Sequence, residues 1–200
     1  MCGRYTIFTE EEIIEMQEII NQINKKYGYD TVKTGEIFPS DVAPIVRMAD
    51  GKAEIDRGTW GFPGFGTVKR PIINARSETA HEKRMFSEPL KKSRCVVPST
   101  GFYEWTHENK KAVDKYLFRQ PDTSMLYLAG MTWSFMDTSG EWRDHYVILT
   151  QASNEYIAPY HDRMPVILQK NELVKWMRDD EYVSTVFTRT GPELLSEKAG

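Results

Sequence analysis

The sequence predicts an α+β fold, in which a curved or barrel-like, mostly antiparallel β-sheet core is flanked by helices in a single domain over residues 1–200. Three observations predict it. A segment near the N-terminus carries apolar residues at helical spacing, short β-like runs fill the middle of the chain, and shorter helical patterns lie among and after them. Two hundred residues, 40% of them hydrophobic and 28% charged, can bury the core of one globular domain.

A helix is the first element expected, after a short apolar stretch from Arg4 to Phe8. Thr9 is followed three residues later by Glu12, a spacing typical of a capping box, in which each side chain bonds the backbone N–H of the other residue. Isoleucines then recur at roughly helical spacing, and Gly28 marks the expected end of the helix. These isoleucines are Ile13, Ile14, Ile20 and Ile23.

Strands are expected in the middle of the chain, because apolar, β-branched and aromatic residues dominate seven short runs between turn-rich pieces such as MADGK and DTSGEW. The runs cover residues 44–48, 53–60, 94–98, 101–105, 115–119, 125–133 and 145–150. Residues 28–43 resemble a loop, and further helices are expected over 78–86, 153–158 and 171–178.

Composition excludes several classes of protein. No apolar run approaches the roughly 18 residues of a membrane span, and the N-terminus lacks the pattern of a secretory signal, so a cytoplasmic protein is expected. Two cysteines, Cys2 and Cys95, are too few for a disulfide framework or a cysteine-based zinc site. The net charge of −3 means that any nucleic-acid site must rest on a local basic patch.

Cys2 directly follows the initiator methionine. Removal of Met1 would give Cys2 a free α-amine next to its thiol, and two nucleophiles on neighbouring carbons can act together on one carbonyl group. The alternative is that Cys2 is a small residue entering a first strand, which is the more common role of a single cysteine.

Two further residues are candidates for proton transfer. Glu104 lies between aromatic residues in GFYEW, where an inward orientation would raise the pKa of its carboxyl group, although this motif alone favours an outward, solvated side chain. His161 lies in APYHDRMP, and an unperturbed histidine has a pKa of about 6.5, which suits a catalytic acid or base at neutral pH. The alternative is a loop histidine whose ring is hydrogen-bonded to the backbone. The sequence contains no metal-binding histidine motif and no phosphate-binding glycine loop, so no metal or cofactor is expected.

Five motifs follow one another along residues 2–165: MCGRY, WGFPGF, NARSET, CVVPSTGFYEW and HDRMP. In this order they closely resemble the SOS-response-associated peptidase (SRAP) family, the abasic-site processing proteins of DNA repair. The resemblance implies the SRAP fold. It also implies that the mature N-terminal cysteine, after autocatalytic or aminopeptidase removal of Met1, crosslinks to the aldehyde of an abasic site in single-stranded DNA as a thiazolidine, a lyase-like reaction.

The resemblance also implies roles for other residues. Cys2 is the implied nucleophile, Asn74 orients the amine and substrate, Glu104 moves protons, and His161 assists opening of the sugar ring. Arginines at three matching positions would hold DNA phosphates, and Phe65, with Pro44 opposite, would replace the longer aromatic wedge of the family. The arginines are Arg4, Arg76 and Arg163.

Two other functions stay open at this point. A cysteine peptidase acting on protein substrates could use Cys2, His161 and Asn74 as nucleophile, base and orienting amide. A non-catalytic reader of single-stranded or modified DNA would need Cys2 only as a structural residue. The expected partner is single-stranded DNA with abasic sites, bound by a monomer in the cytoplasm, at the nucleoid if the source is bacterial.

Overall fold

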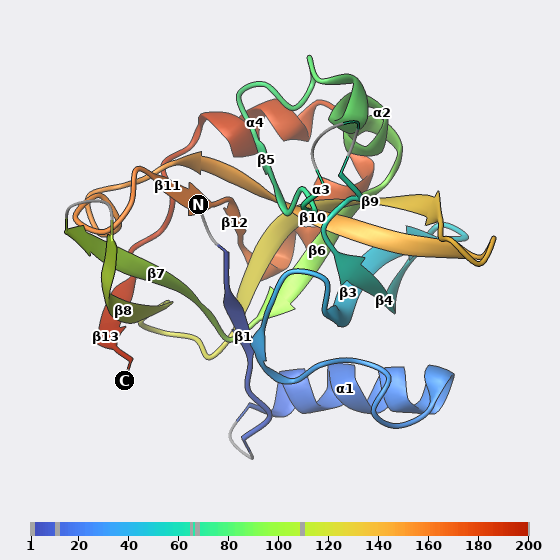
Figure 1. The fold of residues 1–200 in the computed structure, drawn as a ribbon, viewed down its shortest axis with the longest axis horizontal. Helices are drawn as coiled ribbons and strands as arrows, with labels where there is room; N and C mark the ends of the chain where they lie inside the picture. The colour runs from blue at the N-terminus through green and yellow to red at the C-terminus, as the bar shows by residue number, and fades with distance from the viewer. Residues whose placement is uncertain (1–2, 11–12, 65, 67–68, 109–110, 200) are drawn as a thin grey trace.

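The computed structural model describes residues 3–10, 13–64, 66, 69–108 and 111–199, and a closed five-stranded β-barrel forms its core (Figure 1). β10 (Trp142–Ala152) pairs with β4 (Lys52–Trp60), β4 with β3 (Val42–Ala49), β3 with β6 (Arg94–Ser99), β6 with β9 (Leu126–Met136), and β9 with β10. The pairing of β10 with β4 is parallel, and the other four pairings are antiparallel. Ring closure gives every strand two neighbours, which removes exposed sheet edges. The predicted α+β fold with a barrel-like, mostly antiparallel sheet is confirmed.

Short strands extend this sheet beside the barrel. β5 (Asn74–Arg76) runs parallel to β10, β11 (Arg163–Pro165) runs antiparallel to β10, and β12 (Ile167–Leu168) pairs with β9. β12 lies in the run PVILQ, whose apolar, β-branched residues are typical of a strand. The sequence pattern predicts neither β5 nor β11, because each is only three residues long and is held by its pairing with β10.

A second, five-stranded sheet packs beside the barrel. Its order is β13 (Leu195–Lys198), β8 (Lys111–Arg119), β7 (Gly101–Glu108), β1 (Tyr5–Ile7) and β2 (Gly35–Ile37), and the strands are antiparallel. Tyr5 joins the two sheets, since its ring packs edge-on against Trp60 at 5.1 Å and its hydroxyl lies 2.6 Å from that of Tyr146. Both sheets therefore share one core.

Helices cover the outside of the barrel. α1 (Ile14–Tyr27) contacts β3 and β4, and α2 (Arg84–Lys92) contacts β6 and β9. α3 (Leu173–Arg178) follows the short 3₁₀ turn Lys170–Glu172 and packs on β6 and on α4 (Tyr182–Thr188). The Trp176 indole N–H donates a 2.9 Å hydrogen bond to the Cys95 carbonyl, which fixes α3 to the barrel. No helix among the described residues is long and apolar enough to cross a membrane.

The seven predicted strand runs lie in strands except for Met125, which precedes β9, and the predicted helix over 171–178 is confirmed as the 3₁₀ turn and α3. α1 ends as predicted, because Gly28 adopts φ 90° and donates its N–H to the Asn24 carbonyl. Its start differs: the helix begins at Ile14, not after Thr9, and Glu12 lies outside the described residues.

Two predicted helices are wrong. Over 78–86, turns and a bend extend to residue 83 and the helix starts only at Arg84, while over 153–158 the first two residues are irregular and turns begin at residue 155. In the second case the Asn154 side chain accepts from the Ile157 N–H as an N-cap does, and the Ala158 N–H bonds the Asn154 carbonyl, but the helix does not continue. Pro159 has no N–H, and the Tyr160 N–H donates to Ile157, three residues back, rather than to the residue four back. The domain bounds, 1–200, stay a prediction.

Candidate active site

The C-terminal half of β10 brings together two of the motifs that the sequence analysis singled out. β5, from NARSET, pairs with one side of this strand, and β11, from HDRMP, pairs with the other. Thr150 lies opposite both Arg76 and Pro165 in the two registers. Residues about ninety positions apart in the sequence therefore flank one strand, with Asn74 on β5 and His161 just before β11.

An ion pair links these two motifs across β10. The Arg163 guanidinium donates to both carboxylate oxygens of Glu78, at 2.6 and 2.8 Å, and to the Thr150 carbonyl at 2.6 Å. The hydrogen bond from Arg163 holds the pKa of the Glu78 carboxyl below its usual range, and the charge of Arg76 adds to the effect. Arg163 is 8% exposed, so its guanidinium is committed within the protein.

Glu104, on β7, points into the protein. Its neighbour on the same face, Phe102, stacks on Phe118 of β8 at 5.4 Å, and Glu104 itself lies opposite Tyr116. Only 2% of Glu104 is exposed, and this burial raises the pKa of its carboxyl group to about 7. The outward orientation favoured by the motif alone is thus wrong.

The segment that precedes β11 covers this face of β7 and β8. The Tyr160 ring lies 4.7 Å from that of Tyr116 and 5.0 Å from that of Phe118. The negative charge of Asp162 adds to the rise in the pKa of Glu104. Because Tyr116 pairs with Glu104, this ring packing places the segment that carries His161 next to the strand that carries Glu104.

His161 is a partly buried, mainly neutral imidazole. Burial is the main cause that lowers its pKa, and the positive charge of Arg163 contributes. Its Nδ1 accepts a hydrogen bond of 2.9 Å from the Arg163 backbone N–H, which leaves the proton of the neutral ring on Nε2. Protonation of Nδ1 would instead favour Asp162, whose Oδ1 lies 2.8 Å away. The neutral ring can therefore accept a proton from a reacting group, and its Nε2–H can donate a hydrogen bond.

The first strand runs beside Glu104. Tyr5 pairs with Phe102, and the Arg4 carbonyl accepts a 2.9 Å hydrogen bond from the Tyr103 N–H. Cys2, the predicted nucleophile, lies outside the described residues. Asn74 is half-buried on β5 and lies opposite Ile148 of β10.

Arg4 and the loop before β3 form a basic and aromatic surface. The Arg4 guanidinium bonds Glu36 at 2.6 Å, lies 3.6 Å from the centre of the Phe38 ring, and lies 5.6 Å from that of Trp105. Phe38 is 43% exposed, and the Asp41 carboxylate fixes its loop by accepting the Phe38 N–H at 2.8 Å. No sequence pattern points to Phe38, which lies in the loop-like stretch 28–43.

The other predicted DNA contacts differ in exposure. Arg76 is exposed at the end of β5. Pro44 is buried in the barrel strand β3, opposite Arg57, so the expectation that its ring faces a DNA base is corrected: it offers no surface for stacking. Phe65 lies outside the described residues.

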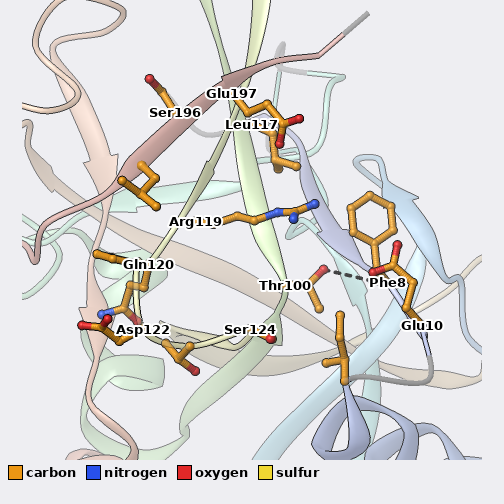
Figure 2. Close-up of a pocket in the computed structure, with 14 residues that line it drawn as sticks. Phe8, Glu10, Thr100, Leu117, Arg119, Gln120, Asp122, Ser124, Ser196 and Glu197 are labelled. Atoms are coloured by element: carbon orange, nitrogen blue, oxygen red, sulfur yellow. Dashed lines mark hydrogen bonds between the residues drawn. The ribbon is translucent and has the colours of Figure 1, made fainter.

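A cavity of about 740 Å³ lies elsewhere, at the end of the second sheet, and contains none of the predicted site residues. Figure 2 shows Arg119 extending into it from β8, with Glu10 and Phe8 on one side and Asp122 in the loop below. Glu10, Asp122 and Glu197 contribute three carboxylates to the lining, against one guanidinium. This balance of charge disfavours DNA phosphate in the cavity. Among the described residues, no cluster of three or more His, Cys, Asp or Glu side chains could hold a metal ion.

Comparison with known proteins gives a consistent result. The chain is 30% identical over 200 residues to the abasic site processing protein YoqW of Bacillus subtilis, which covers 93% of this chain and 86% of the relative. It is 27% identical over 183 residues to the abasic site processing protein YedK of Escherichia coli, covering 90% of this chain and 81% of the relative.

Solved structures share the fold. A crystal structure of a protein from Bordetella bronchiseptica matches with a TM-score of 0.78 and 24% identity over the full length of both chains. A protein from Bacteroides thetaiotaomicron also matches with a TM-score of 0.78, at 23% identity, over 98% of this chain and 91% of that one. The family model described as SOS response associated peptidase (SRAP) matches residues 1–193, and the chain therefore belongs to the SRAP family.

Proposed function

We propose that this protein processes abasic sites in single-stranded DNA by forming a covalent bond through Cys2 after removal of Met1. The names of its relatives, abasic site processing proteins, support the general activity. The observation that carries the chemical proposal is the buried Glu104, a carboxyl group with a pKa of about 7 on the strand that pairs with the N-terminal strand. Such a group can both accept and donate protons at neutral pH.

The register of β1 and β7 supports an N-terminus close to Glu104. Tyr5 pairs with Phe102 and Arg4 bonds Tyr103, so one further antiparallel step sets Gly3 opposite Glu104. A processed Cys2 amine would then start within reach of the proposed proton carrier.

The proposed reaction needs only the protein and the DNA. The α-amine of Cys2 attacks the aldehyde carbon of the ring-opened sugar, and loss of water gives an imine. The Cys2 thiolate then adds to the imine carbon, forming a C–S bond, while the nitrogen takes a proton to give a thiazolidine. The net change is aldehyde plus aminothiol to thiazolidine plus water, without an oxidant or reductant.

Each neighbouring residue has a distinct role in this proposal. Protonated Glu104 donates to the departing hydroxyl, and ionised Glu104 accepts a proton from the incoming nucleophile. His161 moves a proton at the sugar oxygen as the ring opens, and Asn74 orients the amine by hydrogen bonding. Arg163 positions the site, because its bonds to Glu78 and its backbone N–H to His161 connect β5 with the segment before β11.

The residues proposed to contact DNA are those whose side chains reach the surface. Arg76 is exposed and holds a phosphate, and Arg4 adds positive charge at the other side of the site. Phe38 is the aromatic surface on which a base next to the lesion stacks. Binding is therefore salt-sensitive but largely independent of sequence. The protein is proposed to act as a monomer in the cytoplasm.

Intact-mass spectrometry tests the proposal. The protein is mixed with a single-stranded oligonucleotide that carries one abasic site, and with undamaged and borohydride-reduced controls. We expect a denaturation-resistant adduct of protein plus DNA minus water, formed without reductant, on chains that have lost Met1. Cys2→Ala should abolish it.

Cys95→Ala is the matched control for the thiol. Cys95 is fully buried in the barrel, and burial raises the pKa of its thiol far above the usual range, so its loss should leave the adduct unchanged. An adduct seen only after borohydride treatment would indicate a simple imine. DNA binding that Cys2→Ala retains, with no adduct from a processed wild-type chain, would favour a non-catalytic reader, and cleavage of protein substrates would favour a peptidase.

A further inference from the structure

A groove between α2 and the end of β9 lies apart from the candidate active site. It has a volume of about 610 Å³, and α2 and β9 supply its walls. The lining residues are Arg84, Met85, Glu88, Pro89, Trp133 and Phe135. Four of these six side chains are apolar, so the groove can take up a bulky apolar group.

The floor of the groove is part of the packed core. Phe135 lies 5.2 Å from Phe62, ring centre to ring centre, and Phe62 lies 6.2 Å from Phe86 of α2. Trp133 remains 38% exposed at the edge. The groove is therefore preformed, and an apolar ligand side chain would cover exposed indole surface without rearranging the core.

The rim of the groove is positively charged at one end. Lys83 and Arg84, at the N-terminal end of α2, are exposed and form no ion pair with another described residue, whereas Glu88 is neutralised by Lys92 at 2.5 Å. The first turn of α2 carries no acidic residue and no side-chain cap, so its backbone N–H groups add to the positive potential near Arg84. An anionic group next to an apolar anchor would satisfy both features.

We propose that this groove binds a short acidic peptide segment of a partner protein, with a bulky apolar side chain against Trp133 and Phe135 and a carboxylate at Arg84. A nucleic acid fits less well, because the lining is mainly apolar, includes the Glu88 carboxylate, and lacks a row of cations for successive phosphates. The proposal is independent of the chemistry at Cys2.

Fluorescence anisotropy tests the proposal on the full chain. The probe is a fluorescein-labelled peptide of two aspartates, a glycine, two leucines and a phenylalanine. We expect saturable binding with a dissociation constant on the order of 10–100 µM. Arg84→Glu should weaken it at least about tenfold, by repelling the carboxylate. Lys25→Glu, a matched charge reversal in α1, should leave it unchanged.

Control peptides and a second variant distinguish specific binding from non-specific binding and from misfolding. Two control peptides, one with lysines for the aspartates and one with serines for the apolar residues, should both bind at least about tenfold more weakly than the probe. Arg84→Gln serves as the second variant if Arg84→Glu fails to fold, and the melting temperature and the yield of DNA adduct report on the integrity of each variant. Equal binding of the lysine peptide, no binding at about 1 mM, or competition by undamaged single-stranded DNA would overturn the proposal. Sedimentation showing a dimer that Arg84→Glu dissociates would assign the groove to a second copy of the chain instead.

Discussion

Replacing Glu104 by Gln should change how the stability of the protein depends on pH. The carboxyl group is buried, and its pKa is about 7 rather than its ordinary 4.5. Below the ordinary pKa it is protonated in both the folded and the unfolded chain. As pH rises towards 7, the unfolded chain ionises first, so stability is lost progressively and the loss levels off above the folded-state pKa.

The size of the effect follows from the two pKa values. Their difference corresponds to ~3 kcal/mol at high pH, because each tenfold change in proton affinity is worth about 1.4 kcal/mol. Between about pH 5 and about pH 8 the wild-type protein should lose ~2.5 kcal/mol of stability that Glu104→Gln does not lose, since glutamine does not ionise. The variant should therefore gain stability over the wild type as the pH rises.

Urea unfolding at a series of pH values measures this difference, with Glu108→Gln as the control. Glu108 is an exposed carboxylate on the same strand, so its replacement should change the pH dependence little. A free-energy difference between wild type and Glu104→Gln that stays constant within about 0.5 kcal/mol from pH 5 to 8 would refute the reasoning. The same variant should form the DNA adduct about 10²–10⁴ times more slowly, because proton transfer is lost.

Three further substitutions test the surrounding geometry. Arg163→Ala should destabilise the fold by ~2–4 kcal/mol in thermal or urea unfolding, because it removes both hydrogen bonds to Glu78 and one of the two that the Thr150 carbonyl accepts, the other coming from the Ser77 N–H. Glu78→Gln should cost less, since Glu78 is about half exposed. Arg76→Ala should weaken binding of single-stranded DNA several-fold, and the slope of the logarithm of the binding constant against the logarithm of the salt concentration should become less steep by about one. Arg119→Ala, in the acidic cavity, should change neither the affinity nor this slope in the same titrations. Phe38→Ala should cost ~1–2 kcal/mol of DNA affinity with little change in melting temperature, and an unchanged affinity would exclude base stacking there.

The elements that the sequence predicts are those whose signal is local. α1 shows helical spacing of apolar residues over its own length, and the barrel strands are runs of apolar residues bounded by turns. β5 shows no such pattern: its residues, Asn74–Arg76, are extended because they bond to β10, about seventy positions later in the chain. Strands of this kind depend on a partner that a local window does not contain.

The same limit explains the error over 78–86. The segment has good helix-forming residues, but the Glu78 carboxylate is bonded to Arg163, and turns carry the chain from β5 to α2. A contact across 85 residues thus overrides local propensity. The orientation of Glu104 has a similar cause. Its neighbours on both faces of β7 are aromatic, so alternation alone cannot select a face, and the packing of Tyr160 over Tyr116 decides it.

The sequence alone also does not distinguish an arginine that binds DNA phosphate from one that holds the fold together. Arg76 and Arg163 both lie in motifs that match the SRAP family, and either could bind phosphate by charge alone. Their environments differ: Arg76 is exposed, while the Arg163 guanidinium is 8% exposed and already donates to a carboxylate and a carbonyl. To bind phosphate, Arg163 would have to break its bidentate ion pair with Glu78 and its hydrogen bond to the Thr150 carbonyl, which costs more than a solvent-exposed phosphate contact returns. A chain with a net charge of −3 can therefore hold DNA through a few exposed cations while its buried arginine maintains the geometry of the site.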